Sequence, residues 1–457
     1  MLTVNPGLAG VVAFDTEIAE PDRDGGALRY RGVDINSLAG NVSYGDVWGL
    51  LVDGDFARGL PVAEHLQPVD NSGDIRADVQ AAVALLAPRW GLRQLIDITD
   101  EQARDDLARA SAAVLSYAAQ AARAMFPPGA RKSFPTSAGG GPSTPGRDRR
   151  GPVSGDARWA AGDTSRAAGG GAGLPGVSQR AFESGGAGLP GVSQRAFESG
   201  GAGLPGVPQR AFEAGGAGLP AVPRRLIEAG RTATERFMIE WQGEPDPRHV
   251  AAIDRYWICA AEHGMNASTF TGRVVASTGA DAPACLSAAI AALSGPLHGG
   301  APSRALGMIE AVESGIDARR YVRQVLDAGQ RLMGFGHAIY RAEDPRARIL
   351  RQTARELHAP RYEVARELEL AALAELRERK PDRVLETNVE FWAAVILDFA
   401  GVPADLFAAM FTCARTAGWS AHILEQKRLG KIIRPSADYV GPGERDAHTV
   451  AGWPASR

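Results

Sequence analysis

Apolar residues recur at the spacing of an α-helix through most of this chain. Segments 41–54, 72–88 and 101–126 carry apolar residues at positions i, i+3, i+4 and i+7, and glycines close several such segments. The same spacing predicts further helices over 246–264, 281–295, 301–315, 317–334, 344–360 and 360–380. Alternating apolar and polar residues are scarce outside 10–21 and 27–32. The sequence therefore predicts an all-α fold with one minor pair of N-terminal β-strands.

One long segment departs from this pattern. Residues 128–223 are crowded with Gly, Pro, Ser and Arg, and the unit GGAGLPGVSQRAFES occurs at 170–184 and again at 185–199. A near copy follows at 200–214 and a degenerate copy at 215–229. Each copy offers too little apolar surface to offset the entropy cost of ordering its glycines. We predict a disordered repeat insert at 128–223, and a linker or interaction arm is the alternative.

Charge and cysteine usage narrow the class of protein. The net charge of −3 gives no basic excess that would favour nucleic acid or an anionic membrane surface. Cys259, Cys285 and Cys413 lie in alanine-rich contexts without a C-x-x-C pair, which predicts reduced thiols. We see no signal peptide at the N-terminus and no apolar run approaching the ~18 residues of a membrane span. A cytoplasmic protein is expected, and an anionic ligand would need a local basic cluster.

The stretch ETNVEFWAAV at 386–395 places Glu390 just before a tryptophan-containing apolar run. Thr387 and Glu390 fit the T-x-x-E capping box, in which the glutamate satisfies an unpaired backbone N–H. Alternatively, Glu390 is a general base at the mouth of a buried helix. The two interpretations are compatible, because the third position of a helix favours an ionised carboxylate and a base must be ionised.

Two histidines stand among glycines at expected helix ends. His298 lies between Pro296 and Gly299-Gly300, and a helix with Pro302 in its first turn follows. Glycines allow close approach of the backbone to a ligand, and a helix N-terminus disfavours a charged imidazole. A neutral imidazole can donate a hydrogen bond to a carbonyl that is becoming an enolate. The alternative is a histidine that merely packs in a turn.

His337 has the same surroundings and two arginines nearby. It follows Gly334 and Gly336, and Arg341 and Arg346 come shortly after it. One histidine and two arginines around a turn predict a receptor for a carboxylate or phosphate, because arginine binds such groups bidentately. A solvated charged face is the alternative.

His263, Arg415 and Arg434 are further candidates for contacts with an anion. A metal site that uses the histidines is the competing interpretation. The chain contains no H-E-x-x-H and no tight Cys/His spacing, so we expect no metal. Its glycine-rich pieces match neither a P-loop nor G-x-G-x-x-G, so no nucleotide-binding fingerprint is present.

Taken together, these stretches resemble the citrate synthase family. GPLHGGA, GFGHAIYRAEDPRA, NVEFW and ARTAGWSAHILEQ followed by KIIRP occur in the family's order and near its spacing. The resemblance runs from about residue 7 to about residue 442, interrupted by the insert. It implies a large helical domain and a small domain with the cleft between them. The large domain would comprise 1–127, 224–299 and 402–457, and the small domain 300–401.

The resemblance assigns catalytic roles to three residues. His298 would stabilise the enol(ate) of the acetyl thioester, and His337 would polarise the ketone of oxaloacetate. Glu390 stands where most of the family has the aspartate that deprotonates the acetyl methyl group. Glutamate adds one methylene, a shift in reach of ~1.5 Å, and a misplacement of ~1 Å can cost on the order of 100-fold in rate. Because the flanking motif is intact, we expect the backbone to accommodate the longer side chain.

The resemblance also implies the binding residues and the reaction. His263, Arg346 and Arg415 would hold the carboxylates of oxaloacetate or citrate, Arg341 would lie near the phosphates of coenzyme A, and Arg434 would reach into the partner subunit's site. The short N-terminus resembles that of dimeric members, so a homodimer is expected. The implied enzyme condenses acetyl-CoA with oxaloacetate and water in the tricarboxylic acid cycle, with no cofactor besides the thioester substrate.

Two alternatives to this function remain. A 2-methylcitrate synthase would use propionyl-CoA, and one methylene of pocket space is worth only about 1–3 kcal/mol of discrimination. A non-catalytic protein on the same fold is the other alternative, motivated by the repeat insert and by the glutamate at position 390.

Overall fold

The computed structural model describes residues 6–8, 10–22, 24, 26–127, 221–295, 298, 301–337 and 339–453. The predicted insert at 128–223 lies outside these residues except for its last three positions. Residues 221–223 are described and lead directly into helix α6.

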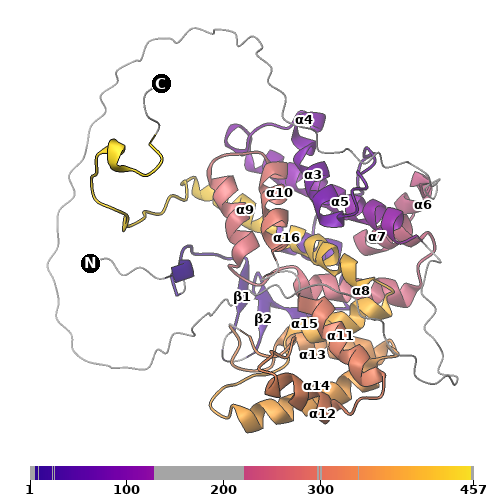
Figure 1. The fold of residues 1–457 in the computed structure, drawn as a ribbon. Coiled ribbons are helices and arrows are strands. Elements are labelled where there is room, and N and C mark those ends of the chain that lie inside the picture. Colours follow the sequence, from indigo (N-terminus) through magenta and orange to yellow (C-terminus); the bar gives the residue numbers. More distant parts are fainter. Residues whose placement is uncertain are drawn as a thin grey trace, which may run out of the picture. The chain divides into compact units, whose positions relative to one another are not determined.

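Helices make up nearly all of the regular structure, as the sequence predicts (Figure 1). The helices before the insert are α1 (Ile35–Leu38), α2 (Tyr44–Asp53), α3 (Ile75–Ala84), α4 (Leu86–Trp90) and α5 (Asp100–Met125). Those that follow it are α6 (Arg224–Glu228), α7 (Ala233–Gln242), α8 (Pro247–Ala260), α9 (Ala267–Ser277) and α10 (Ala282–Leu293). The remaining helices are α11 (Ala301–Glu313), α12 (Ala318–Asp327), α13 (Pro345–Glu356), α14 (Tyr362–Arg379), α15 (Val389–Phe399) and α16 (Phe407–Leu429).

The predicted N-terminal strand pair is also present. Strands β1 (Ala19–Pro21) and β2 (Leu28–Tyr30) pair antiparallel, and the short β3 (Val33–Asp34) continues the sheet in the order β1-β2-β3. Single 3₁₀ turns occur at η1 (Pro6–Leu8), η2 (Leu95–Asp97), η3 (Ala404–Leu406) and η4 (Ala447–Thr449).

Local side chains explain where several helices begin and end. Ser43 and Asp46 form a capping box at the start of α2, and Thr99 and Gln102 do the same for α5. Gly54 ends α2 in the left-handed conformation, with φ of 87°, which glycine adopts without strain. These boundaries fall within a few residues of the predicted ones.

The core is centred on α16, which packs against α2, α5, α8, α9 and α10. The indoles of Trp419 in α16, Trp48 in α2 and Trp257 in α8 are fully buried. All three cysteines are buried and unbridged, in agreement with the prediction of reduced thiols. None of the described helices combines the length and the hydropathy needed to cross a membrane.

Helices α11 to α15 form a second group, in the lower part of Figure 1. Within it, α11 and α13 pack on α15, and α12 packs on α14. Helix α8 contacts both α13 and α15 as well as α16. Helix α8 is therefore in contact with both groups of helices.

The C-terminal end of α8 differs from the prediction. The sequence pattern places its end at Gly264, whereas the helix ends at Ala260. The Tyr30 hydroxyl lies 3.0 Å from the Ile258 carbonyl and 3.1 Å from the Glu262 carbonyl. The Glu262 N–H also donates to the Tyr30 oxygen at 3.3 Å. This distant hydroxyl therefore binds backbone groups on both sides of Ala260, where the chain leaves the helix.

A half-buried carboxylate between α5 and α7 makes stability depend on pH. Glu240 accepts hydrogen bonds from Ser116 Oγ (2.8 Å) and Gln120 Nε2 (3.2 Å), and burial raises its pKa to about 7. The protonated form stabilises the fold fully below about pH 4.5, and this contribution is lost as the pH rises through about 7. The expected loss is about 3 kcal/mol.

Replacing Glu240 by glutamine removes this titration while it keeps an oxygen acceptor. We expect the thermal midpoint of Glu240→Gln to match that of the parent near pH 4.5 and to exceed it by several degrees near pH 8. Equal midpoints at both pH values would contradict the assignment. Glu228→Gln, an exposed residue of α6 paired with Arg224, serves as the control.

Candidate active site

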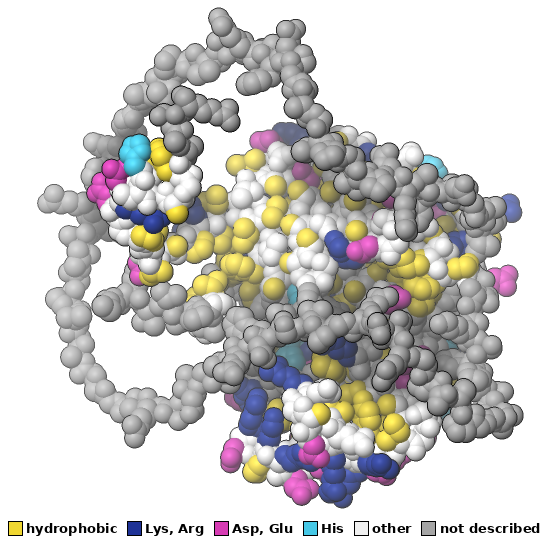
Figure 2. Space-filling view, viewed as in Figure 1, with side chains coloured by type: hydrophobic (Ala, Val, Ile, Leu, Met, Phe, Trp, Pro, Cys, Tyr) yellow, Lys and Arg dark blue, Asp and Glu magenta, His cyan; other side chains and the backbone are white. Residues whose placement is uncertain are grey.

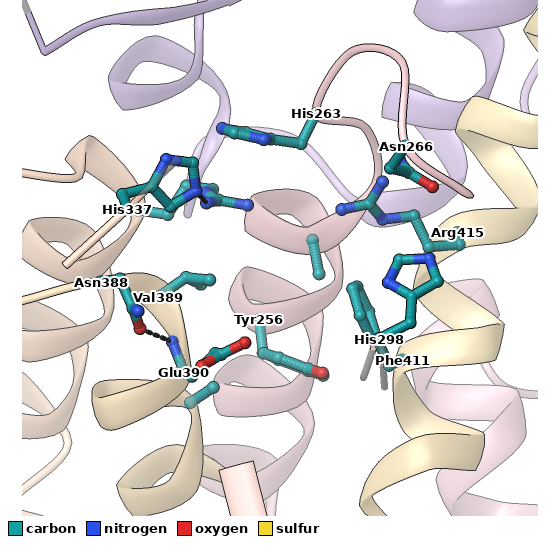
Figure 3. A pocket seen from close by; sticks show the side chains of 13 residues that line it. Tyr256, His263, Asn266, His298, His337, Asn388, Val389, Glu390, Phe411 and Arg415 are labelled. Carbon is teal, nitrogen blue, oxygen red and sulfur yellow. Dashed lines mark hydrogen bonds between the residues drawn. The ribbon is translucent and has the colours of Figure 1, made fainter. Parts of the chain in front are cut away.

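A cavity of about 180 Å³ lies where the two groups of helices meet α8 (Figure 3). Six of the eight residues that the sequence singled out line it: His263, His298, His337, Arg346, Glu390 and Arg415. The rest of the lining consists of Tyr256, Ala260, Asn266, Asn388, Val389, Ala393 and Phe411. Residues spread over more than 150 positions of the sequence therefore converge on one small space.

Glu390 is not the capping residue that the T-x-x-E pattern suggests. Asn388 is the N-cap of α15, and its Oδ1 accepts the backbone N–H of Glu390 at 3.0 Å (Figure 3). Glu390 is thus the second residue of the helix, not the third, and Thr387 lies outside the cap. The capping-box prediction is wrong because the neighbouring asparagine competes successfully for the cap position.

The Glu390 carboxylate faces the cavity instead. No described residue donates a hydrogen bond to it, and its side chain extends toward Tyr256 (Figure 3). Burial raises its pKa, the Asp344 charge raises it further, and Arg346 acts in the opposite direction. An unpaired, partly desolvated carboxylate of this kind is suited to accept a proton.

The loop that carries His337 is bound to the segment that precedes Glu390. The Gly336 N–H donates to the Glu386 carbonyl at 2.7 Å, and the Asn388 N–H donates to the Gly334 carbonyl at 2.9 Å. A Cβ on Gly334, whose φ is 84°, would lie 2.6 Å from the Phe391 Cβ. Glycine is therefore required there for the close approach of the loop to α15.

The backbone determines the tautomer of His337. Its Nδ1 accepts the N–H groups of Ile339 (3.0 Å) and Tyr340 (3.2 Å). Burial and the Arg346 charge lower its pKa to about 4. The ring is therefore neutral near pH 7 and carries its proton on Nε2, which lies 3.3 Å from Arg346 Nη2. The Arg346 N–H points at this nitrogen, so when Nε2 carries the proton the arginine N–H must turn away from it. Both atoms can then donate to one acceptor oxygen of a ligand.

Asp344, which the sequence analysis did not single out, holds Arg346 in place. Its carboxylate accepts Arg346 Nε at 3.0 Å and Nη2 at 2.8 Å, and both side chains are buried. Its Oδ2 also accepts the N–H of Val389, the first residue of α15, at 3.0 Å. One carboxylate therefore positions the arginine and the helix of Glu390. The sequence signal was its place as an N-cap residue just before Pro345.

Arg415 presents donors that the described protein leaves without a partner. Its side chain projects from α16, only 4% of the residue is exposed, and neither Nε nor Nη1 has a hydrogen-bond partner among the described residues. Burial lowers its pKa, and the Glu262 charge partly offsets this effect. Arg415 lines the cavity, and a buried guanidinium in that position is suited to bind a carboxylate.

The last two histidines are also neutral near pH 7. Burial lowers the pKa of His263 well below its ordinary value, and its Nε2 lies 3.0 Å from the Tyr340 hydroxyl. Burial and the Arg415 charge lower the pKa of His298 to about 4. His298 Nε2 lies 3.0 Å from Ser268 Oγ, a neighbour that the sequence analysis missed.

Comparison with known proteins identifies the family. The model of the family described as "Citrate synthase, C-terminal domain" matches residues 7–138 and 220–436. A Mycobacterium tuberculosis protein named "Putative citrate synthase 2" is 53% identical over 449 residues, which cover 98% of this chain and 96% of that protein. The chain belongs to the citrate synthase family. It is an acyltransferase of the type that converts the acyl group to an alkyl group on transfer.

More distant members of the citrate synthase family bear different names and share the fold. A 2-methylcitrate synthase from Shewanella oneidensis is 42% identical over 212 residues, which cover 45% of this chain and 55% of that protein. The solved citrate synthase of Thermoplasma acidophilum, a ternary complex with carboxymethyl coenzyme A and oxaloacetate, matches with a TM-score of 0.66 at 21% identity. The match covers 97% of this chain and 98% of that one. At this identity the likeness establishes the fold alone.

The two remaining predicted residues of this citrate synthase family member lie outside the cavity lining. Arg341 is exposed, and its Nη1 lies 3.4 Å from the His337 carbonyl. Arg434 is exposed in the segment after α16. Figure 2 shows histidine side chains in the hollow between the upper and lower helices, with lysine and arginine side chains gathered below it. Among the described residues, no group of three or more metal-ligating side chains could hold a metal ion.

Proposed function

We propose that the protein is a citrate synthase that condenses acetyl-CoA with oxaloacetate and water to give citrate and CoA. The observation that carries the proposal is that one cavity is lined by two buried arginines, by neutral histidines and by Glu390, whose carboxylate has no hydrogen-bond donor among the described residues. The two arginines supply the charge that the dianion oxaloacetate requires. Glu390 supplies the base that the methyl group of the thioester requires.

In the first chemical step, Glu390 removes a proton from the methyl group of the acetyl thioester. His298 then donates to the thioester oxygen as the enol(ate) forms, a role that a neutral imidazole can fill. For His298 Nδ1–H to be the donor, Nε2 must accept the hydroxyl proton of Ser268, which lies 3.0 Å away. Trp419 Nε1 donates to the same serine oxygen at 3.2 Å, but Asn266 Oδ1, 2.8 Å from that oxygen, competes for the hydroxyl proton. The serine hydroxyl must therefore turn from Asn266 to His298 for His298 Nδ1–H to be the donor.

In the second step, the enol(ate) attacks the ketone carbon of oxaloacetate. His337 Nε2–H donates to the ketone oxygen, while Arg346, Arg415 and His263 hold the two carboxylates. Arg346 is well suited to this, because the Asp344 carboxylate accepts its Nε–H and one N–H of Nη2 and so fixes the plane of the guanidinium. Water then hydrolyses the citryl thioester, and closure of the site would exclude water until condensation is complete.

The proposal includes an assembly around this centre. Residues 300–401 would act as the small domain that closes over the rest, Arg341 would lie near the CoA phosphates, and Arg434 would reach the partner subunit's site in a homodimer. We propose that the enzyme works in the cytoplasm, at the first step of the tricarboxylic acid cycle, with no cofactor besides the thioester.

A second candidate is a 2-methylcitrate synthase, favoured by the relative of that name from Shewanella oneidensis. The two reactions differ by one methylene on the acyl group. Ala393 and Ala260 are the small residues of the cavity lining, and room beside them would favour the longer acyl group. Both candidates use the same base, histidines and arginines.

Release of free CoA thiol with each acyl-CoA tests the proposal. We expect oxaloacetate-dependent release from acetyl-CoA, with kcat/KM at least about 10-fold above that for propionyl-CoA, the discrimination that one methylene supplies. A preference for propionyl-CoA would reverse the choice between the two candidates. No release with either thioester, from folded protein, would support a non-catalytic protein on this fold.

A further inference from the structure

Tyr340 makes contacts with two histidines of the candidate active site, although it does not line the cavity. Its backbone N–H donates to His337 Nδ1 at 3.2 Å, and its hydroxyl lies 3.0 Å from His263 Nε2. Its ring centroid lies 4.9 Å from that of His337 and 5.2 Å from that of His263. One residue therefore touches both imidazoles, and each contact is made on one ring nitrogen.

The direction of the hydroxyl bond follows from burial. Tyr340 is only 2% exposed, so its O–H proton needs an acceptor inside the protein. Among the described residues, His263 Nε2 is the one acceptor within hydrogen-bonding distance of this hydroxyl. Burial raises the pKa of Tyr340 and lowers that of His263, so a neutral phenol faces a neutral imidazole. The phenol O–H then donates, and Nε2 accepts.

The two bonds leave opposite tautomers on the two rings. A neutral imidazole carries one proton, and the nitrogen that accepts a bond is the unprotonated one. His337 accepts on Nδ1 and therefore carries its proton on Nε2. His263 accepts on Nε2 and therefore carries its proton on Nδ1.

We infer that Tyr340 is a positioning residue that holds His263 and His337 as neutral donors of opposite tautomer, so that both present an N–H to one dianionic substrate. This inference rests on the proposed function, because it takes oxaloacetate as the anion. The physical need is clear. A histidine in the wrong tautomer would present a nitrogen lone pair to a carboxylate oxygen, and the two would repel each other. A protonated ring could donate from both nitrogens, but the lowered pKa of each histidine keeps both rings neutral near pH 7.

The ring of Tyr340 supports the same arrangement from the side. The two imidazoles meet edge to face, with centroids 5.0 Å apart and planes at 84°. The Arg346 guanidinium carbon lies 6.0 Å from the centre of the tyrosine ring. Phenylalanine would keep these ring contacts and lose the hydroxyl alone, so Tyr340→Phe isolates the effect on His263.

The experiment has two readouts. With ¹⁵N-labelled histidine, long-range ¹H–¹⁵N spectra distinguish Nδ1–H from Nε2–H rings, and the His263→Gln variant assigns the signals of His263. We expect His263 of the parent protein to be the Nδ1–H tautomer, and its signals in Tyr340→Phe to move toward the Nε2–H pattern. The dissociation constant for oxaloacetate should rise about 10-fold in that variant, the effect of one hydrogen bond to an ion.

A merely structural role would give a different result. Loss of folded protein would lower the number of binding sites without changing the dissociation constant or the tautomer of the remaining sites. In Tyr340→Phe, kcat at saturating oxaloacetate should stay within about 3-fold of the parent, so the effect appears in KM. Tyr362→Phe is the matched control, because that half-buried tyrosine packs on Trp392 away from the cavity and should change neither readout.

Three outcomes would overturn the inference: an Nε2–H tautomer of His263 in the parent, an unchanged tautomer in Tyr340→Phe, or an unchanged dissociation constant. If the variant does not fold, the spectrum of the parent alone decides, because it is recorded without substrate. A parent that shows the Nδ1–H tautomer but does not bind oxaloacetate would contradict the proposed function and leave the tautomer assignment standing.

Discussion

Glu390→Gln is expected to lower kcat by on the order of 1000-fold, because the amide cannot accept a proton from the methyl group of the thioester. The dissociation constant for oxaloacetate should change by less than about 3-fold. The carboxylates of that substrate are assigned to Arg346, Arg415 and His263, and not to Glu390. Thiol release measures the first quantity, and calorimetric titration with oxaloacetate measures the second.

The controls for this prediction test charge and reach separately. Glu378→Gln removes an exposed carboxylate on α14 and should leave both quantities unchanged. Glu390→Asp introduces the aspartate that most of the citrate synthase family has at this position, and it shortens the reach of the side chain by ~1.5 Å. If the backbone of α15 is placed for the longer side chain, this variant should lose about 10- to 100-fold in kcat. Retention of most activity by Glu390→Gln would rule out the base role.

The helices could be predicted because their signals are local. The apolar spacing of α5, its capping box at Thr99 and Gln102, and Gly54 at the end of α2 all lie within the segments that they define. The end of α8 could not be predicted, because the backbone there binds the Tyr30 hydroxyl, which comes from a strand more than two hundred residues earlier. Contacts at such separation leave no periodic trace in the sequence.

Six of the eight site residues could be found because they lie in motifs that resemble a known family, and all of the six except Glu390 stand within three residues of a glycine or proline. The sequence predicted a neutral His298 from an expected helix N-terminus, but it did not reveal the cause that the structure shows. The neutral state of His298 results from burial and from Arg415, which is distant in sequence. Ser268 was missed because its role is a hydrogen bond to His298, which belongs to another segment of the chain. Asp344 was missed because an N-cap position alone does not show that the same carboxylate binds Arg346 and the N–H of Val389.

The glutamate at position 390 shows how two plausible local rules can conflict. Thr387 and Asn388 are both good N-cap residues, and choosing the first makes Glu390 part of a capping box. The structure uses the second, so the carboxylate is released from the backbone and its pKa is raised by burial. The helix dipole still favours the ionised carboxylate at the second position of the helix. Desolvation favours the neutral form and is the larger effect, so the pKa of Glu390 is raised.

Arg415→Met is expected to make the empty protein more stable and to remove most of its affinity for oxaloacetate. The guanidinium is buried with two donors that lack a described partner, and the nearby positive charge of Arg346 adds repulsion. Methionine of similar length removes the cost of burying unsatisfied donors, which is about 1–3 kcal/mol. Glu262 loses one attractive charge but keeps His422 Nε2 at 3.3 Å. We therefore expect the thermal midpoint without ligand to rise by a few degrees.

With oxaloacetate the order of the two proteins should reverse. The parent gains stability by binding, by RT ln(1 + [L]/Kd), whereas the variant has lost the donors that one carboxylate needs. Two charge-assisted bonds correspond to an increase in Kd of on the order of 100- to 1000-fold. Arg428→Met is the control, because Arg428 lies on α16 like Arg415 but is exposed and pairs with Asp100 of α5. This variant should leave the ligand-induced shift intact. If the variant without ligand is less stable than the parent and still binds oxaloacetate, Arg415 serves the fold. If it is more stable and no longer binds oxaloacetate, the buried charge of Arg415 is kept for the substrate and lowers the stability of the protein.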